Sequence, residues 1–122
     1  MLKAEHRLGL VFFPAFDWAI SPSHPEREEM LLYTQDQIFE EGIMDIENIK
    51  TYNPELASLK DVQRVHFCVP DVEERVTKSH LISAGGAIKA AHVVMEKEVD
   101  KAFALVRPPG HHAHRVVYGD RG

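Results

Sequence analysis

A short apolar run that ends abruptly in a proline-rich turn and two adjacent histidines constrains this chain most. Residues 102–106 have the composition of a buried strand, and Arg107-Pro108-Pro109-Gly110 follows directly. The two prolines lack backbone donors and have a fixed φ, so they end the strand, while Gly110 leaves room for a bend or for a ligand. In an open α/β sheet, ligands bind just beyond the carboxyl ends of the strands. The sequence therefore places its candidate chemistry at this turn.

His111 and His112 come directly after the turn. Unperturbed imidazoles titrate near pH ~6.5, so two of them can divide the roles of base and acid around one water molecule. We predict that this histidine pair is the centre of a catalytic site. The alternative is a proline-rich loop in which the histidines are incidental.

The segments before this turn predict an alternation of strands and helices. Leu8–Phe13 is an almost continuous apolar run stopped by Pro14, and a shorter candidate strand, Ile49–Tyr52, is closed by Asn53-Pro54. Helices that alternate with short apolar strands are typical of an α/β fold with a parallel sheet. We predict a partial parallel sheet flanked by helices.

Three segments have the pattern of helices. One begins near Ser23 to Pro25 and stops at Gly42, a short one is capped by Ser58 with Asp61, and the longest is capped by Ser79 and reaches about Lys97. The apolar face expected for the longest helix consists of Leu81, Ala84, Ile88, Ala91 and Met95. Gly85-Gly86 inside it costs roughly 1 kcal/mol per residue relative to alanine, which favours close packing of helix on sheet. The charged stretch before it, residues 70–78, is expected to be a solvent-facing connection.

The overall composition excludes several classes of protein. A length of 122 residues suits one domain, residues 1–122, and the net charge of −5 without a basic run argues against nucleic-acid binding. No apolar stretch approaches the length of a membrane span, and no signal-peptide pattern begins the chain. The single cysteine, Cys68, has apolar neighbours and is expected to be an inert core residue. These features predict a cytoplasmic protein.

The segment from Arg107 to Ala113 resembles the active-site signature of the histone deacetylase family without a substitution. Residues 57–66 and the Ala84-Gly85-Gly86 segment are also similar to the family. The resemblance implies the N-terminal portion of the arginase/deacetylase fold, so we expect one truncated domain of this kind.

The resemblance also implies roles for individual residues. His111 and His112 correspond to the general base and to its electrostatic or acid partner, and neither is a metal ligand in relatives. Arg27, in the segment His24-Pro25-Glu26-Arg27, corresponds to an arginine that lines the substrate channel, and Gly110 is placed with it; the alternative for Arg27 is a solvated charge. The acidic residue that grips the substrate backbone in relatives could be Asp71, Glu73 or Glu74. Three other histidines, His66, His80 and His92, are expected to have structural or surface roles.

The family hydrolyses acetyl amides with zinc, whose ligands lie in a part of the domain that follows the matched segments. We therefore expect no zinc bound specifically by this chain, and we expect the chain alone to be inactive. The cluster of His111, His112 and His114 could bind nickel or zinc only adventitiously. An acetylated small molecule or peptide remains a possible ligand.

In the family fold, the strand that precedes the histidines is paired on both sides. Here residues 102–106 would expose one apolar edge, and such edges recruit other chains. We therefore expect a homo-oligomer that covers this edge. Two functions stay open: part of a zinc-dependent deacetylase acting on acetyl-lysine or acetylpolyamine-type amides, and a non-catalytic oligomeric α/β module derived from that family.

Overall fold

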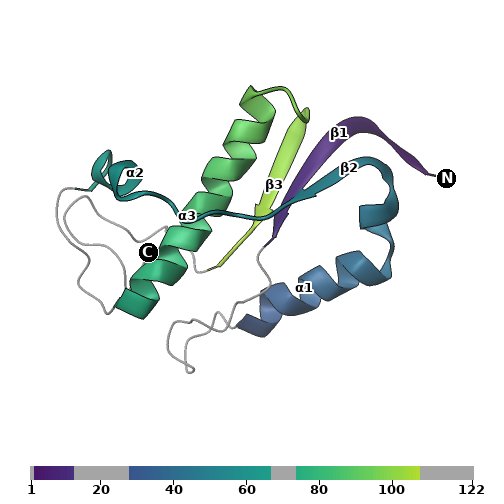
Figure 1. The fold of residues 1–122 in the computed structure, drawn as a ribbon. Coiled ribbons are helices and arrows are strands. Elements are labelled where there is room, and N and C mark those ends of the chain that lie inside the picture. The colour runs from purple at the N-terminus through teal and green to yellow at the C-terminus, as the bar shows by residue number, and fades with distance from the viewer. Residues whose placement is uncertain (1, 13–27, 67–73, 108–122) are drawn as a thin grey trace.

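The computed structural model of the chain describes residues 2–12, 28–66 and 74–107, which form a parallel sheet with helices on both faces (Figure 1). The elements in chain order are β1 (Lys3–Phe12), α1 (Glu28–Glu40), the 3-10 helix η1 (Ile43–Asp45), β2 (Glu47–Tyr52), α2 (Leu59–Gln63), α3 (Glu74–Met95) and β3 (Lys101–Leu105).

The sheet has the strand order β2-β1-β3, and both pairs of neighbours are parallel. Leu10 lies opposite Thr51 on one side and Phe103 on the other, and Phe12 lies opposite Leu105. The predicted parallel α/β sheet is therefore confirmed. The central strand is the apolar run expected to be buried on both faces, and its last four residues are buried.

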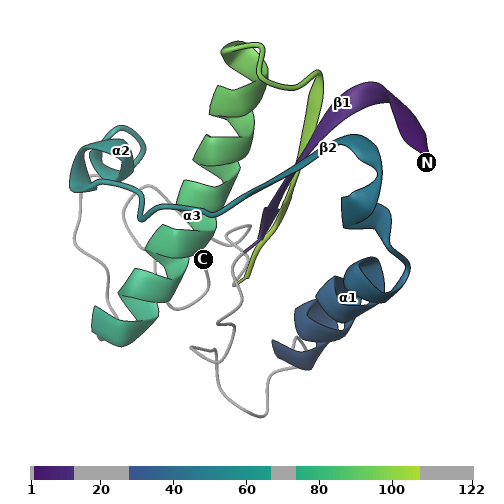
Figure 2. The same cartoon turned by 45° about the vertical axis from the view of Figure 1, so that its right-hand side comes forward.

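The two faces of the sheet are covered by different helices (Figure 2). Leu10, Phe12 and Leu105 form a buried cluster, against which Ile38 of α1 and Met44 of η1 pack. Successive side chains of a strand point to opposite faces. Val11, which is fully buried, therefore faces the other side, where α3 contacts β1 and β3.

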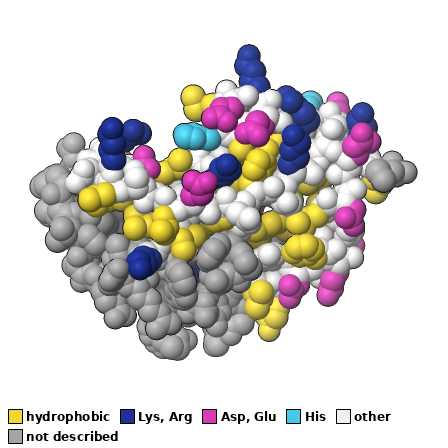
Figure 3. Space-filling view, in the orientation of Figure 1, with side chains coloured by type: hydrophobic (Ala, Val, Ile, Leu, Met, Phe, Trp, Pro, Cys, Tyr) yellow, Lys and Arg dark blue, Asp and Glu magenta, His cyan; other side chains and the backbone are white. Residues whose placement is uncertain are grey.

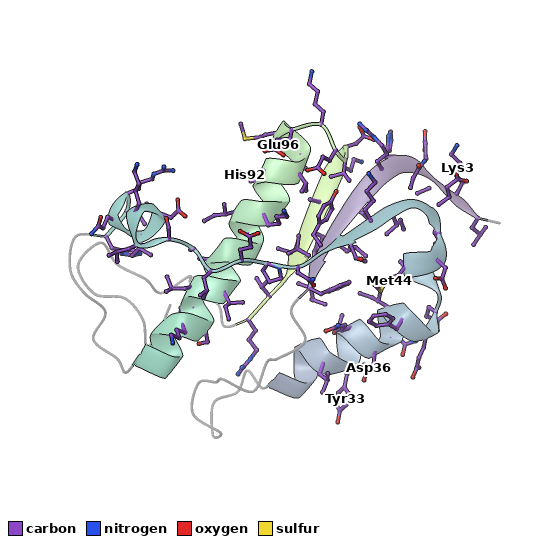
Figure 4. All side chains as sticks on the ribbon, viewed as in Figure 1. Lys3, Tyr33, Asp36, Met44, His92 and Glu96 are labelled. Atoms are coloured by element: carbon purple, nitrogen blue, oxygen red, sulfur yellow. The ribbon has the colours of Figure 1, made fainter. Side chains whose placement is uncertain are left out.

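Side-chain positions on α1 follow from this packing. In Figure 4, Met44 of η1 lies between α1 and the sheet, whereas Tyr33 and Asp36 of α1 point away from the strands. The space-filling view shows hydrophobic side chains at the surface of α1, and Leu32, Tyr33 and Phe39 are its exposed apolar residues (Figure 3). The helix stops where it was expected to: Gly42 follows it with a φ of 70°.

The long helix α3 differs from its prediction at its start. It begins at Glu74, so Ser79 is not its cap but lies inside the helix, where only 4% of its surface is exposed. The charged stretch was expected to be a connection, yet its last part is helical. Charged residues with good helix propensity extend a helix as readily as they solvate a loop.

The buried face of α3 also differs from the prediction. Ser79, Gly86 and Val93 are buried at a spacing of seven residues, whereas Ala84 and Ala91 are exposed and Met95 is 79% exposed. Small residues allow the helix axis to approach its neighbours closely, so they determine the buried face instead of the larger side chains. His92, near the end of α3, is exposed, and so is Glu96, which follows the last residue of the helix (Figure 4).

The ends of two helices are closed by defined caps. The Ser58 side chain accepts a hydrogen bond from the Asp61 amide, and the Asp61 carboxylate accepts one from the Ser58 amide, so the predicted cap is confirmed as a capping box. These bonds lower the pKa of Asp61. At the end of α3, Lys97 has a φ of 63°, and the amide of Glu98 donates to the carbonyl of Val93 at 3.0 Å. This is a Schellman motif with lysine where glycine is usual.

An ion pair joins the middle of β1 to the turn between α3 and β3. The Arg7 guanidinium donates to the Asp100 carboxylate at 3.0 Å and to the carbonyl of Lys97 at 3.0 Å. The backbones of Arg7 and Asp100 are also linked, because the Asp100 amide donates to the Arg7 carbonyl at 2.9 Å. Hydrogen bonds from the Arg7 side chain lower the pKa of Asp100 to about 2.

Among the described helices, none is long and apolar enough to cross a membrane.

Candidate functional site

The carboxyl ends of the three strands meet at one edge of the sheet. Phe12 and Leu105 lie opposite each other in register, and Tyr52, the last residue of β2, lies opposite Val11. The chain leaves all three strands at this edge. The exits of β1 and β3 lead into residues 13–27 and 108–122, the segments that carry the predicted site residues.

The exit of β3 is held by packing. Val106 is half-buried, and the following residue, Arg107, has only 6% of its surface exposed. A guanidinium is rarely buried without hydrogen-bond or charged partners. Arg107 was expected only as part of the motif, and its burial was not predicted. The signal available in the sequence was its place between a buried strand and two prolines.

The exit of β2 is held against α3 by a close crossing of two backbones. A Cβ atom added to Gly85 would overlap the carbonyl oxygen of Glu55 and would lie 3.0 Å from the amide nitrogen of Ala57. That amide donates to the carbonyl of Leu81 at 2.9 Å, and Ala57 is 6% exposed. The glycine pair was expected to pack on the sheet. The close approach is confirmed, but its partners are the loop after β2 and Val106.

Tyr52 is the last residue of β2 and directly precedes this loop. Its ring fits against Gly9, where an added Cβ would lie 3.1 Å from the ring, and the Lys89 ammonium lies 5.7 Å from the ring centroid. Its hydroxyl is buried and has no hydrogen-bond partner among the described residues. Burial, and to a lesser extent the charge of Glu98, raise the pKa of Tyr52.

The predicted catalytic residues His111 and His112 lie outside the described residues, as do the predicted channel residues Arg27 and Gly110. The same holds for His114, for Cys68 and for two of the three candidate acidic residues, Asp71 and Glu73; the third, Glu74, is the first residue of α3. The structure brings together the strand ends from which the site segments leave.

His66, His80 and His92, for which structural or surface roles were expected, all lie among the described residues, His66 after α2 and the other two on α3. His92 is exposed on α3, whereas His66 and His80 are half-buried. Within the described ranges, no three side chains of the His, Cys, Asp and Glu types gather in a way that could hold a metal ion. The described part of the chain therefore offers no ligand set for the zinc that the resemblance implies.

Comparisons with known proteins extend these observations. The family model of the histone deacetylase domain matches residues 20–119. A probable deacetylase of Archaeoglobus fulgidus is 44% identical over 115 residues, which cover 80% of this chain and 32% of that protein. Polyamine deacetylase HDAC10 of Danio rerio is 24% identical over 99 residues, covering 77% of this chain and 13% of that protein.

A solved structure shows the same fold. The crystal structure of the HDA15 HD domain superposes with a TM-score of 0.72 at 20% identity, covering 89% of this chain and 37% of that chain. The chain thus spans 32% of the length of its Archaeoglobus relative and 37% of this structural relative. With most of its residues matched by the family model and the expected fold present, the chain belongs to the histone deacetylase family.

Proposed function

We propose that this chain is the N-terminal part of a zinc-dependent deacetylase that hydrolyses acetyl-lysine or acetylpolyamine-type amides. One observation carries the proposal: β3 ends at the shared carboxyl edge of the sheet and runs directly into the tandem-histidine motif. That edge is where α/β proteins bind their ligands. The substrate class is supported by the relatives, one named a probable deacetylase and another a polyamine deacetylase.

In this proposal the two histidines handle protons. His111 is the general base that takes a proton from the attacking water, and His112 is its electrostatic or acid partner. Arg27 and Gly110 line the channel that the acetylated substrate enters. Zinc, when bound, would polarise the amide carbonyl. The described residues provide no ligand set for it.

We infer further that the chain is inactive alone. General acid–base catalysis contributes only about 10²–10⁴-fold, which is far below the rate enhancement that enzymes achieve. The histidine pair therefore needs the metal and the groups that surround it in the complete domain. In the whole protein, the histidine pair would contribute this rate enhancement of about 10²–10⁴-fold, and the metal and its surrounding groups would contribute the rest.

The experiment is a complementation assay. The chain is mixed with the separately expressed remainder of the Archaeoglobus deacetylase and zinc, and hydrolysis of an acetyl-lysine peptide and of acetylputrescine is measured. We expect turnover only in the mixture, with a loss of about 10²-fold or more in His111→Ala and in His112→Ala. His114→Ala is the matched control in the same segment, and it should retain turnover.

Other outcomes of this assay contradict specific parts of the proposal. Turnover by the chain alone that is lost in His111→Ala would show that the isolated chain is active. A mixture that forms a stable complex without turnover would favour the second candidate function, a non-catalytic oligomeric module.

The module hypothesis has an observation of its own. Among the described residues β3 pairs only with β1, and Phe103 on this edge strand is 58% exposed. We propose that a second copy of the chain covers this edge. We also propose that the protein is cytoplasmic. Sedimentation should show an assembly at micromolar concentration that Phe103→Lys dissociates and Tyr33→Lys, at an exposed site on α1, does not. A monodisperse wild-type monomer would contradict it.

A further inference from the structure

We propose that Gly86 is a positioning residue that fixes the course of the chain leaving β3, and thereby the placement of His111 and His112. This inference rests on the proposed function, because the histidine pair has a catalytic role only there. Gly86 lies on α3, remote in sequence from the histidine motif, and it touches the chain immediately after β3.

The geometry at Gly86 places one side chain where a Cβ would be. A Cβ atom added there would lie 2.5 Å from Cγ1 of Val106, 3.4 Å from Cβ of Pro54 and 3.7 Å from Cβ of Val106. The isopropyl group of Val106 therefore occupies the space left by the missing side chain. Pro54 follows β2, so Gly86 is in contact with the exits of both outer strands.

This contact is rigid on both sides. Valine is branched at Cβ, which restricts its χ1 angle, so Val106 cannot easily turn its Cγ1 away. On the other side, Gly86 is buried within the backbone of a long helix. A side chain at position 86 would therefore displace the backbone of residue 106.

A backbone displacement at residue 106 can be transmitted to His111 and His112 through a short segment of the chain. The next residue, Arg107, is buried, so a displacement there cannot simply be absorbed by solvent. Pro108 and Pro109 have fixed φ angles and leave few free torsions before Gly110. Four residues separate Val106 from His111. Displacing Val106 should thus alter the surroundings of the two imidazoles.

The neighbouring glycine has a different role, which makes the inference specific to one position. A side chain at Gly85 would meet the backbone of Glu55 and Ala57 in the loop after β2. It would not meet Val106. Ala87, the next residue along the helix, is exposed and supplies a matched control site.

The experiment exchanges the sizes of the two side chains in contact. Gly86→Ala, Val106→Ala and the double variant are prepared in the full chain, and the imidazole carbon–proton resonances of His111 and His112 are recorded by NMR with the melting temperature. We expect each single variant to shift both histidine resonances, and the double variant to bring them back toward their wild-type positions. Ala87→Ser should leave them unchanged.

Two results would overturn the inference. If Gly86→Ala lowers the melting temperature while both histidine resonances stay in place, Gly86 supports only the fold. If the resonances shift but Val106→Ala does not restore them, the effect does not pass through Val106. Should Gly86→Ala fail to fold, Val106→Ala alone decides the matter, because unchanged resonances in that variant contradict the proposed route. The readout needs no turnover, so its failure is distinct from a failure of the complementation assay.

Discussion

Replacing Gly85 with alanine tests how the loop after β2 is attached to α3. In most exposed helix interiors this change is favourable, because alanine has a higher helix propensity than glycine by about 1 kcal/mol. Here the added methyl group would overlap the carbonyl oxygen of Glu55 and would lie 2.8 Å from its carbonyl carbon. Both partners are backbone, so neither can rotate away. We therefore predict that Gly85→Ala destabilises the chain.

The magnitude follows from two local terms. Overpacking of a tight site costs typically about 1–3 kcal/mol. Pushing the loop away also breaks the hydrogen bond from the buried Ala57 amide to the Leu81 carbonyl, and a buried donor left without a partner costs about 1–3 kcal/mol. After subtracting the gain in helix propensity, about 1 kcal/mol, the free energy of unfolding should fall by roughly 3 kcal/mol.

The assay is urea unfolding followed by far-UV circular dichroism at one protein concentration. Ala84→Gly, at an exposed site one residue away on the same helix, is the control that measures helix propensity alone. It should lose about 1 kcal/mol. If Gly85→Ala instead gains stability by a similar amount, the close crossing of the two backbones does not exist and the reasoning is refuted.

Three further changes test individual contacts by the same unfolding assay. Because hydrogen bonds from Arg7 hold the pKa of Asp100 at about 2, below its unfolded value of about 3.9, the stability they confer is fully present above about pH 4 and is lost as the pH falls to about 2. Asp100→Asn should lower stability at pH 7 and flatten this acid dependence; an unchanged dependence would contradict it. Lys97→Gly should stabilise the chain by about 0.5 kcal/mol, because φ > 0 costs an L-residue more than glycine loses in entropy, and a loss would show that the cap is not left-handed. Tyr52→Phe should change stability by less than about 0.5 kcal/mol or increase it, since the buried hydroxyl has no described partner. It should also remove a loss of stability as the pH rises through the raised pKa of this phenol, and a loss that persists in Tyr52→Phe would contradict it.

Local chemistry predicted several elements of this fold because few alternatives compete with it. The apolar run before Pro14 became the central strand, and the run before Arg107 became a parallel neighbour. Ser58 and Asp61 formed the expected capping box, since a serine followed three residues later by an acid fits a helix start better than other local structures. Residues 49–52, a weaker pattern, also proved to be part of a strand.

The errors concern α3, where long-range packing decides. Serine is a residue type favoured at helix N-caps, but it can also lie inside a helix, as Ser79 does. The charged residues before Ser79 continue the helical pattern. The periodicity of the larger apolar residues predicted a face that includes Met95, which is exposed. The actual face follows Gly86 and Val93, because the loop after β2 crosses the helix at its glycines. In the local sequence, only the glycine pair itself indicates such a crossing.

Paramagnetic broadening of histidine NMR signals tests whether His111 and His112 lie at the carboxyl edge of the sheet. A nitroxide is attached to a cysteine at Asn53, beside that edge, or at Lys101, at the opposite end of β3, in a Cys68→Ser background. His6 of β1 lies toward the end of the sheet where Lys101 is located. We predict that the label at position 53 broadens the imidazole signals of His111 and His112 more than that of His6, and that the label at position 101 reverses this order. Stronger broadening of the histidine pair by the label at position 101 would contradict it.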